Sequence, residues 1–303
     1  MINIESFQMF STFAIAIFIE VMPFLAIGAL ISAVLEVFVS QERMIKLIPK
    51  SVAGGVALGI GAGFILPTCE CGVVPIVRRL IKKGVPPYMA IAYMLAAPIV
   101  NPVVLVSTYL AFNGNGTMVF GRIGIAVIVA AAMGLYARRF TNVFRESAKA
   151  SLHNHHHGHH DHNHSGETIK QKIKTVVMHA AREFMEMGKY VIIGAVVSAA
   201  FKTFIPMDII IALSENLIVS IIGMITLAIL LSICSEADAF VASSFQVFPM
   251  GAKLAFIGIG PMVDLKLIGM YGATFKKELV IALIVGPTIL VFILSWLVEK
   301  FIF

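Results

Sequence analysis

The residues best suited to chemistry are two cysteines that flank a glutamate. They occur in the run Pro67-Thr-Cys69-Glu70-Cys71-Gly72-Val-Val-Pro75, whose prolines and glycine oppose a regular helix. In an unwound turn both sulfurs could face one ion, whereas residues i and i+2 of a helix point apart. Thiolates prefer soft metals such as Cu(I) and zinc. The run therefore predicts a site for a thiophilic metal or metalloid, which Cys234 would complete as a third sulfur if the two regions meet. The alternative is that these cysteines are small, inert apolar side chains.

Carboxylates form the second group of candidates. Glu70 and Glu236 lie in apolar regions that polar residues interrupt, and Asp238 follows two residues after Glu236. A charged side chain at the centre of a bilayer costs about 2.5–3.5 kcal/mol or more, so it is a functional candidate by default. These acids could bind a cation or take up a proton that drives antiport. Alternatively, each could hydrogen-bond the backbone at a turn.

Two further polar residues follow helix-breaking prolines. Asn101 comes three residues after Pro98, and Asp264 three residues after Pro261. We expect both on the substrate pathway or directly behind it. The alternative for Asp264 is that Lys266 simply neutralises it.

A histidine-rich tract lies between the two apolar parts of the chain. Neutral imidazoles suit zinc, copper and nickel, and such a tract is typical of metal binding. We expect an auxiliary cytoplasmic buffer or sensor, with a passive spacer as the alternative. Its eight histidines are His153, His155, His156, His157, His159, His160, His162 and His164.

The composition indicates which class of protein carries these residues. Of 303 residues, 59% are apolar and 13% charged, with a mean hydropathy of +0.93. Soluble domains are about 45–50% apolar and about 25% charged, so a soluble enzyme is excluded. A disordered chain is excluded as well, because disorder requires low hydrophobicity. The net charge of +6 reflects membrane topology rather than nucleic-acid binding. The sequence contains no P-loop pattern, so it is not expected to hydrolyse ATP itself. The chain is therefore expected to be an all-α polytopic membrane protein and not an enzyme.

About eight membrane segments are expected. A crossing helix needs about 20 apolar residues, and the full-length candidates are 10–38, 87–110, 117–137, 187–205, 252–274 and 279–300. No basic residue precedes Arg43, so the first is expected to be a retained membrane helix rather than a cleaved signal. Two more regions, 52–83 and 216–249, are interrupted at their centres, and paired interruptions of this kind point to a transporter's midplane site. Within the first of them, Gly55, Gly59 and Gly63 predict close helix packing.

The two halves of the chain resemble each other. Glu20–Ala33 aligns with Glu186–Ala199 at an offset of 166 (186 − 20), which also places Glu70 opposite Glu236. Pro98–Asn101 aligns with Pro261–Asp264 at an offset of 163 (264 − 101). We therefore divide the chain into a first membrane repeat at 1–137, a cytoplasmic His-rich linker with an amphipathic helix at 138–186, and a second membrane repeat at 187–303.

Basic clusters suggest how the halves are oriented. Lys and Arg residues occur at 43–50, 78–83 and 138–149, and the positive-inside rule assigns all three clusters to the cytoplasm. The clusters on both sides of 52–83 can be cytoplasmic if this segment is a re-entrant hairpin, which enters and leaves the membrane on the same side. Each half would then have three crossings and one hairpin, so that the repeats are inverted. In the competing arrangement both interrupted regions cross fully and the repeats are parallel; we favour the inverted one.

Two motifs carry a family resemblance. The Pro67–Pro75 run and Ala97-Pro-Ile-Val-Asn-Pro-Val-Val-Leu-Val-Ser-Thr108 resemble the predicted-permease family that includes ArsP-type organoarsenical exporters and permeases assigned to copper and zinc efflux. The resemblance covers the chain apart from the His-rich linker. It implies a multi-pass permease of the bacterial inner membrane with Cys69 and Cys71 in the substrate path. It also implies that some members work beside a second membrane protein.

Together these features predict a secondary permease that exports a thiophilic metal or metalloid ion. It would have no tightly bound cofactor, and zinc is a candidate for the transported or buffered metal. The lipid bilayer, the substrate and a second membrane subunit are the expected partners. The alternatives are uptake of a divalent metal, a membrane thiol redox sensor, and a subunit of a permease complex.

Overall fold

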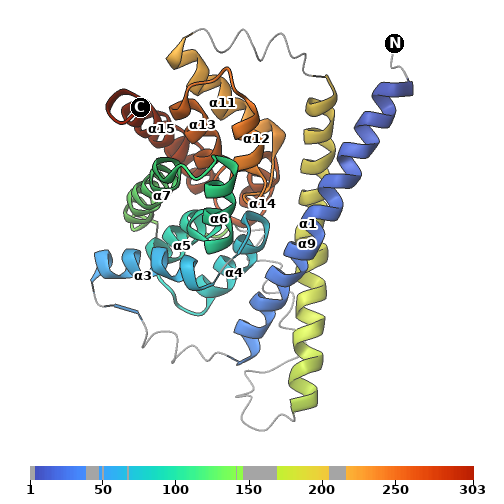
Figure 1. Ribbon diagram of the computed structural model, residues 1–303. Helices are drawn as coiled ribbons and strands as arrows, with labels where there is room; N and C mark the ends of the chain where they lie inside the picture. The colour runs from blue at the N-terminus through green and yellow to red at the C-terminus, as the bar shows by residue number, and fades with distance from the viewer. Residues whose placement is uncertain are drawn as a thin grey trace.

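The structure is a computed structural model that describes residues 4–38, 48–49, 51–66, 68–140, 142–145, 169–204 and 216–303 (Figure 1). These residues form helices and loops, with one isolated antiparallel bridge between Phe144 and Phe275. The all-α prediction is therefore confirmed for the described part of the chain. The helices are α1 (Ile4–Phe38), α3 (Val52–Ile65), α4 (Glu70–Lys82), α5 (Pro87–Val100), α6 (Pro102–Ala111), α7 (Gly116–Ala137), α9 (Ile169–Phe204), α11 (Leu217–Leu231), α12 (Asp238–Ser244), α13 (Met250–Ile259), α14 (Leu265–Thr274) and α15 (Lys277–Phe301).

Several helices are suited to crossing a membrane. Among the described residues, α1, α7, α9 and α15 each contain a span that is long and apolar enough, and the bent pair α5–α6 would be a fifth. The large apolar side chains exposed on these helices, such as Ile19, Phe120 and Ile193, suit contact with lipid. The multi-pass architecture is thus supported, while the count of eight segments stays a prediction.

The predicted single helix at 252–274 is wrong. α13 ends at Ile259, the residues after it turn, and α14 begins only at Leu265. Each piece has 10 residues and is about 15 Å long, half the thickness of a hydrocarbon core. The break lies at Pro261, which has no backbone N–H to donate, and before Asp264, whose side chain accepts the Leu267 N–H at 2.6 Å and starts a new helix.

The first half contains the corresponding break, within the predicted helix 87–110. α5 and α6 meet at Asn101 with a bend of 40°. The Asn101 side chain accepts the Val103 N–H at 3.0 Å and caps α6, as Asp264 caps α14. Each half therefore runs through one order of elements: a long helix, two shorter helices, a broken pair and a second long helix.

α3 and α5 run in the same direction. Gly55 lies against Tyr88 near the start of α5, and Gly63 lies against Ala97 near its end. A Cβ atom at Gly63 would be 2.6 Å from the Ala97 Cα atom, so only glycine allows this approach. The glycine repeat serves close helix packing, as predicted. Because both helices start at the same level, the chain between them, which includes α4, returns towards the end where α3 begins.

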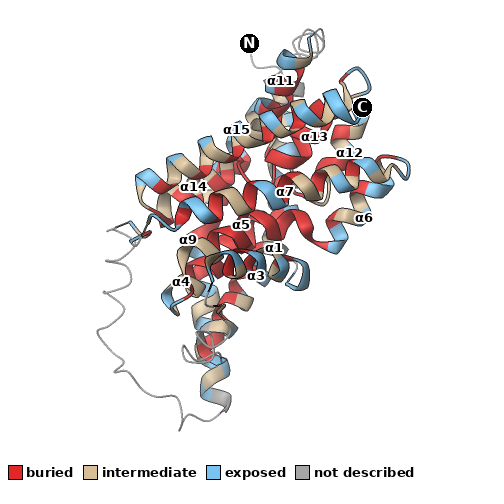
Figure 2. Cartoon of the chain, turned by 90° about the vertical axis from the view of Figure 1, so that its left-hand side faces the viewer, coloured by how far each residue is buried: buried red, intermediate tan, exposed pale blue. Residues whose placement is uncertain are grey.

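The core lies around the two broken pairs. Residues 90–100 of α5 and 251–259 of α13 are buried on all sides, as Figure 2 shows along the centre of the molecule. The long helices α1 and α9 pack against each other to one side (Figure 1). The amphipathic helix predicted within 138–186 and the crossing predicted at 187–205 form one helix, α9, so the predicted boundary at 186 falls inside it.

Candidate functional site

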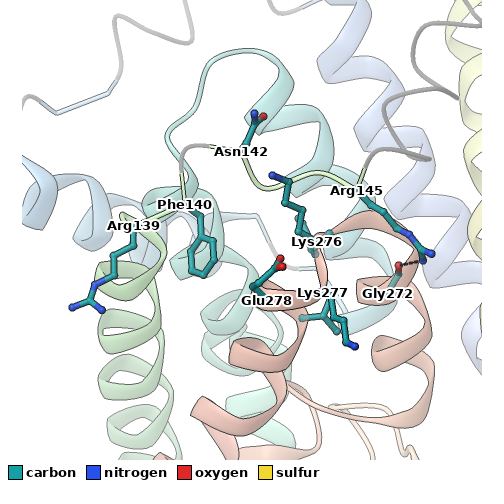
Figure 3. A pocket seen from close by; sticks show the side chains of 10 residues that line it. Arg139, Phe140, Asn142, Arg145, Gly272, Lys276, Lys277 and Glu278 are labelled. Atoms are coloured by element: carbon teal, nitrogen blue, oxygen red, sulfur yellow. Dashed lines mark hydrogen bonds between the residues drawn. The ribbon is translucent and has the colours of Figure 1, made fainter.

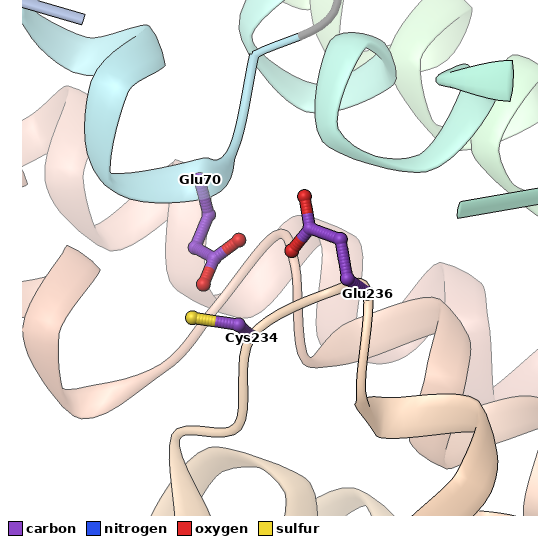
Figure 4. Close-up of side chains that lie close together, drawn as sticks. All are labelled: Glu70, Cys234 and Glu236. Atoms are coloured by element: carbon purple, nitrogen blue, oxygen red, sulfur yellow. The ribbon is translucent and has the colours of Figure 1, made fainter. Parts of the chain in front are cut away.

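Two chain interruptions, one from each half, meet in the core. Glu70 begins α4, and Cys234 and Glu236 lie in the loop between α11 and α12. Each contributes one ligand atom, and these three atoms all lie within 4.8 Å of one another. Figure 4 shows the two carboxylates and the thiol turned towards a common point. Glu70 and Cys234 are buried, and Glu236 is half-buried.

The loop that carries Cys234 and Glu236 has a defined conformation. Ser232 ends α11 with φ of +46°, in the left-handed region that non-glycine residues rarely adopt. Its hydroxyl accepts the Leu265 N–H at 3.1 Å, so the start of α14 supports the loop. The Cys234 carbonyl then accepts the Asp238 N–H at 3.0 Å, closing the turn that leads into α12. These contacts hold Cys234 and Glu236 opposite the start of α4.

Ser235 connects the two glutamates. Its hydroxyl oxygen lies 3.2 Å from a Glu70 oxygen and 3.4 Å from a Glu236 oxygen. A serine hydroxyl has a single hydrogen to donate, so it can satisfy only one of these carboxylates at a time. The pair of acids thus has less hydrogen-bond donation than two ionised carboxylates need. A cation would supply what is missing.

Lys266 lies on the other side of Glu70. Its ammonium nitrogen is 3.6 Å from a Glu70 oxygen and 3.4 Å from an Asp264 oxygen, and all three side chains are fully buried. Both separations exceed the usual 2.7–3.2 Å or so of an N–H···O hydrogen bond. Asp264 is therefore both a helix cap and the partner of Lys266.

Asp238 has a stronger partner in Arg122. The guanidinium contacts both carboxylate oxygens of Asp238, at 2.9 and 2.7 Å, and both side chains are buried. The same guanidinium donates to the Thr108 hydroxyl at 2.7 Å and to the Ser235 carbonyl at 3.3 Å. α7 is thus tied to α6 and to the loop before α12. This network neutralises the charge of Asp238 and supports the backbone that carries Glu236.

The formal charges around the loop do not balance. Four carboxylates that are buried or half-buried, those of Glu70, Glu236, Asp238 and Asp264, face two buried cations, Lys266 and Arg122. With all groups ionised, two negative charges remain. One divalent cation or two protons would neutralise them. Cys234 adds a sulfur ligand at the same place.

A model of the ArsP_1 family, described as "Predicted permease", matches residues 6–300. The chain belongs to this family. It is 41% identical to the UPF0718 protein YcgR of Bacillus subtilis, over 97% of this chain and 98% of that protein. It is 37% identical to the "Putative two-component membrane permease complex subunit" of Streptococcus mutans, over 94% of this chain and 92% of that protein. No solved structure matches significantly. The family resemblance predicted from sequence is confirmed.

Cys69 and Cys71 of this permease are both buried but differ from the predicted geometry. α4 begins at Glu70, so Cys69 is its N-cap and Cys71 is already inside the first turn. The expected unwound turn is wrong at this point, because Glu70–Lys82 is helical and Pro75, inside the helix, removes only the hydrogen bond to the Cys71 carbonyl. Among the described residues, the compact cluster is formed by Glu70, Cys234 and Glu236. The sulfurs of Cys69 and Cys71 are not part of it.

Arg122 was not identified from the sequence of the permease. It was nevertheless visible as the one charged residue in the apolar stretch 117–137. An arginine at such a position predicts a buried acid as partner. The histidines at 153–164 lie outside the described residues.

Proposed function

We propose that this permease exports a thiophilic metal ion through the site formed by Glu70, Cys234 and Glu236. The observation that carries the proposal is the convergence of three ligand atoms from two halves of the chain at a pair of backbone interruptions. Irregular backbone at membrane depth is tolerated where it is buried in protein or lines a cavity. In secondary transporters such interruptions form the substrate site.

The donor set favours a divalent metal over a trivalent arsenical. Zinc accepts cysteine sulfur and carboxylate oxygen at about 2.0–2.3 Å, so two ligands of one ion are at most about 4.6 Å apart. The three atoms, within 4.8 Å of one another, need only a small movement to bind one ion. Three protein ligands leave a fourth position open, which suits an ion that must enter and leave. An arsenical that requires three thiolates would need Cys69 and Cys71 to move towards Cys234.

The directions of the helices support an alternating-access permease. α3 and α5 run in the same direction, and the chain between them returns to the level where α3 begins. This path fits a re-entrant hairpin over 52–83, and with it inverted repeats. Inverted repeats that meet at a midplane site are a common construction of secondary transporters.

We further propose that a second membrane subunit and the histidine tract assist the transport. The Streptococcus mutans relative is named as a subunit of a two-component membrane permease complex. The eight histidines at 153–164 would buffer the metal beside the permease, since imidazole binds zinc, copper and nickel.

The decisive experiment measures metal content and metal resistance in cells that lack the permease. Cells are complemented with the wild type, Cys234→Ser, Glu70→Gln or Glu236→Gln, and challenged with zinc, copper, nickel, arsenite and methylarsenite. Export predicts accumulation and sensitivity for one metal, rescued by the wild type and not by the three variants. Glu278→Gln, at the exposed start of α15, is the matched control and is expected to rescue.

The other outcomes separate the alternatives. Lower metal content in the deleted strain would indicate uptake. Unchanged metal content with altered thiol oxidation would indicate a redox sensor. Failure of Cys69→Ser and Cys71→Ser to rescue, while Cys234→Ser rescues, would place the path along α4 and contradict the proposed cluster.

A further inference from the structure

A basic pocket lies at one end of the helix bundle, where α7 ends and α15 begins (Figure 3). It has a volume of about 790 Å³ and is bounded by the residues that follow α7 and by the junction of α14 and α15. Small-molecule sites usually measure about 300–1,000 Å³, so the pocket is large enough for an organic ligand or a lipid headgroup. It shares no residue with the cluster of Glu70, Cys234 and Glu236.

The charge of the pocket is strongly one-sided. Four cationic side chains line it, Arg139, Arg145, Lys276 and Lys277, against one acid, Glu278. Lys276 is half-buried, and the other three cations are exposed at the rim. In Figure 3 the Lys276 ammonium points towards Asn142, across the pocket from its own helix. The lining therefore selects an anion and offers amide and ammonium donors to bind it.

The pocket is held in shape by contacts between its two sides. The Lys276 N–H donates to the Val143 carbonyl at 2.9 Å, and the Arg145 N–H donates to the Thr274 carbonyl at 3.3 Å. The rings of Phe144 and Phe275 stack with centroids 6.3 Å apart. These contacts fix the backbone of 142–145 against the start of α15, so the backbone that carries Arg145 and Lys276 is in place before a ligand binds.

The hydrogen-bond donors of the Arg145 guanidinium are only partly satisfied within the described chain. Its guanidinium donates to the Gly272 carbonyl at 3.1 Å (Figure 3). A guanidinium has five N–H donors, so several remain for a ligand. Arginine and lysine together are the usual partners of phosphate oxygens.

We propose that this pocket binds a phosphate group, as carried by an anionic phospholipid headgroup. α7 and α15 both have the length and apolar character of membrane spans, so their ends lie at the level of the headgroups. Basic pockets between such helices on the cytoplasmic side bind anionic headgroups, and each lysine or arginine there strengthens the attraction. A soluble phosphate compound has the same recognition chemistry, and the experiment separates the two sources.

The test uses the purified full chain in detergent and native mass spectrometry. Phosphatidylglycerol and phosphatidylcholine are added in equal amounts, and the retained lipid is counted. We expect preferential retention of phosphatidylglycerol by the wild type and a loss of about tenfold or more in Lys276→Gln/Lys277→Gln, since two of the four cations that line the pocket are removed. The control is Lys189→Gln/Lys300→Gln, which changes the net charge equally at exposed positions outside the pocket and should retain the lipid.

A second measurement covers soluble ligands and folding. The melting temperature of each protein is recorded in lipid-free detergent, with and without inorganic phosphate or pyrophosphate. Equal melting temperatures without ligand show that the variants fold. Stabilisation by pyrophosphate that requires Lys276 and Lys277, without lipid preference, would assign the site to soluble phosphates and support the phosphate chemistry. Equal lipid loss in the control pair, or no effect of either ligand class, would overturn the proposal.

Discussion

The ammonium nitrogen of Lys266 lies 3.6 Å from a carboxylate oxygen of Glu70, and neither side chain is exposed. On its other side Glu70 faces Cys234 and Glu236. Glu70 therefore links an internal cation to the place where a metal ion would bind. A metal ion bound at the cluster would compete with Lys266 for the same carboxylate, and Asp264, 3.4 Å from the ammonium, would then remain as the partner of Lys266.

Removal of this cation by Lys266→Met should destabilise the permease in the absence of metal. Glu70 and Asp264 would lose their buried counter-charge, and breaking a buried ion pair by deleting one partner costs about 3–5 kcal/mol. We expect a lower melting temperature in detergent, and recovery of part of the loss when zinc is added, because the metal replaces the missing positive charge.

Two further variants test that explanation. Lys189→Met removes an exposed lysine and should leave the melting temperature nearly unchanged. Lys266→Met combined with Glu70→Gln should be more stable than Lys266→Met alone, since one uncompensated charge is gone. A double variant that is less stable than the single one would contradict the role of Glu70 as the partner.

Arg122→Met should be among the most destabilising single substitutions in the chain. It leaves the buried carboxylate of Asp238 without the guanidinium that contacts both of its oxygens, again at a cost of about 3–5 kcal/mol. Chemical unfolding followed by tryptophan fluorescence measures the change. Arg182→Met, on the exposed surface of α9, is the control. Arg122→Lys should recover only part of the stability, because an ammonium cannot make the two-pronged contact.

The sequence predicted the helical class and the permease family, but not where the central helices break. Most residues in 87–110 and 252–274 are apolar, and an average hydropathy over a window does not register a change of direction. At each bend a proline, Pro102 or Pro261, lies beside a side chain that caps the new helix, Asn101 or Asp264. Both residues follow prolines in the sequence, but their role as helix caps depends on the local backbone geometry.

One contact of the cluster follows from the repeat in the sequence. The alignment of the two halves paired Glu70 with Glu236, and these acids do meet. The sequence could not decide which sulfur joins them, since Cys234 is far from Glu70 along the chain and the contact depends on how two loops dock. The pairing of Arg122 with Asp238 could not be predicted from a local sequence pattern either, because the two residues are 116 positions apart.

Cys234→Ser should weaken zinc binding more than Cys69→Ser or Cys71→Ser. Cys234 is the sulfur within reach of both glutamates, and the loss of even an indirect partner of a metal site costs about 10–100-fold in affinity. Titration calorimetry with zinc measures the affinities. All proteins carry asparagine in place of the eight histidines at 153–164, so that the tract does not contribute. Equal losses for the three cysteines would contradict a site centred on Cys234.

The packing of α3 against α5 predicts opposite results at two glycines of one helix. A Cβ atom at Gly63 would lie 2.6 Å from the Ala97 Cα atom, in the backbone of α5, whereas a Cβ atom at Gly61 has no atom within 4 Å. Gly63→Ala must push the helices apart and should lower the free energy of unfolding by about 1–3 kcal/mol. Gly61→Ala should leave it unchanged or raise it by up to about 1 kcal/mol, because alanine is the better helix former.

The two alanine variants are chemically identical changes, so their difference in melting temperature reports the helix contact alone. If the parallel packing of α3 against α5 is also needed to place Glu70 at the cluster, Gly63→Ala should reduce metal resistance in cells, while Gly61→Ala should not. Equal melting temperatures for the two variants would show that α3 does not pack against α5 through this glycine face, and the return path assigned to α4 would then lose its support.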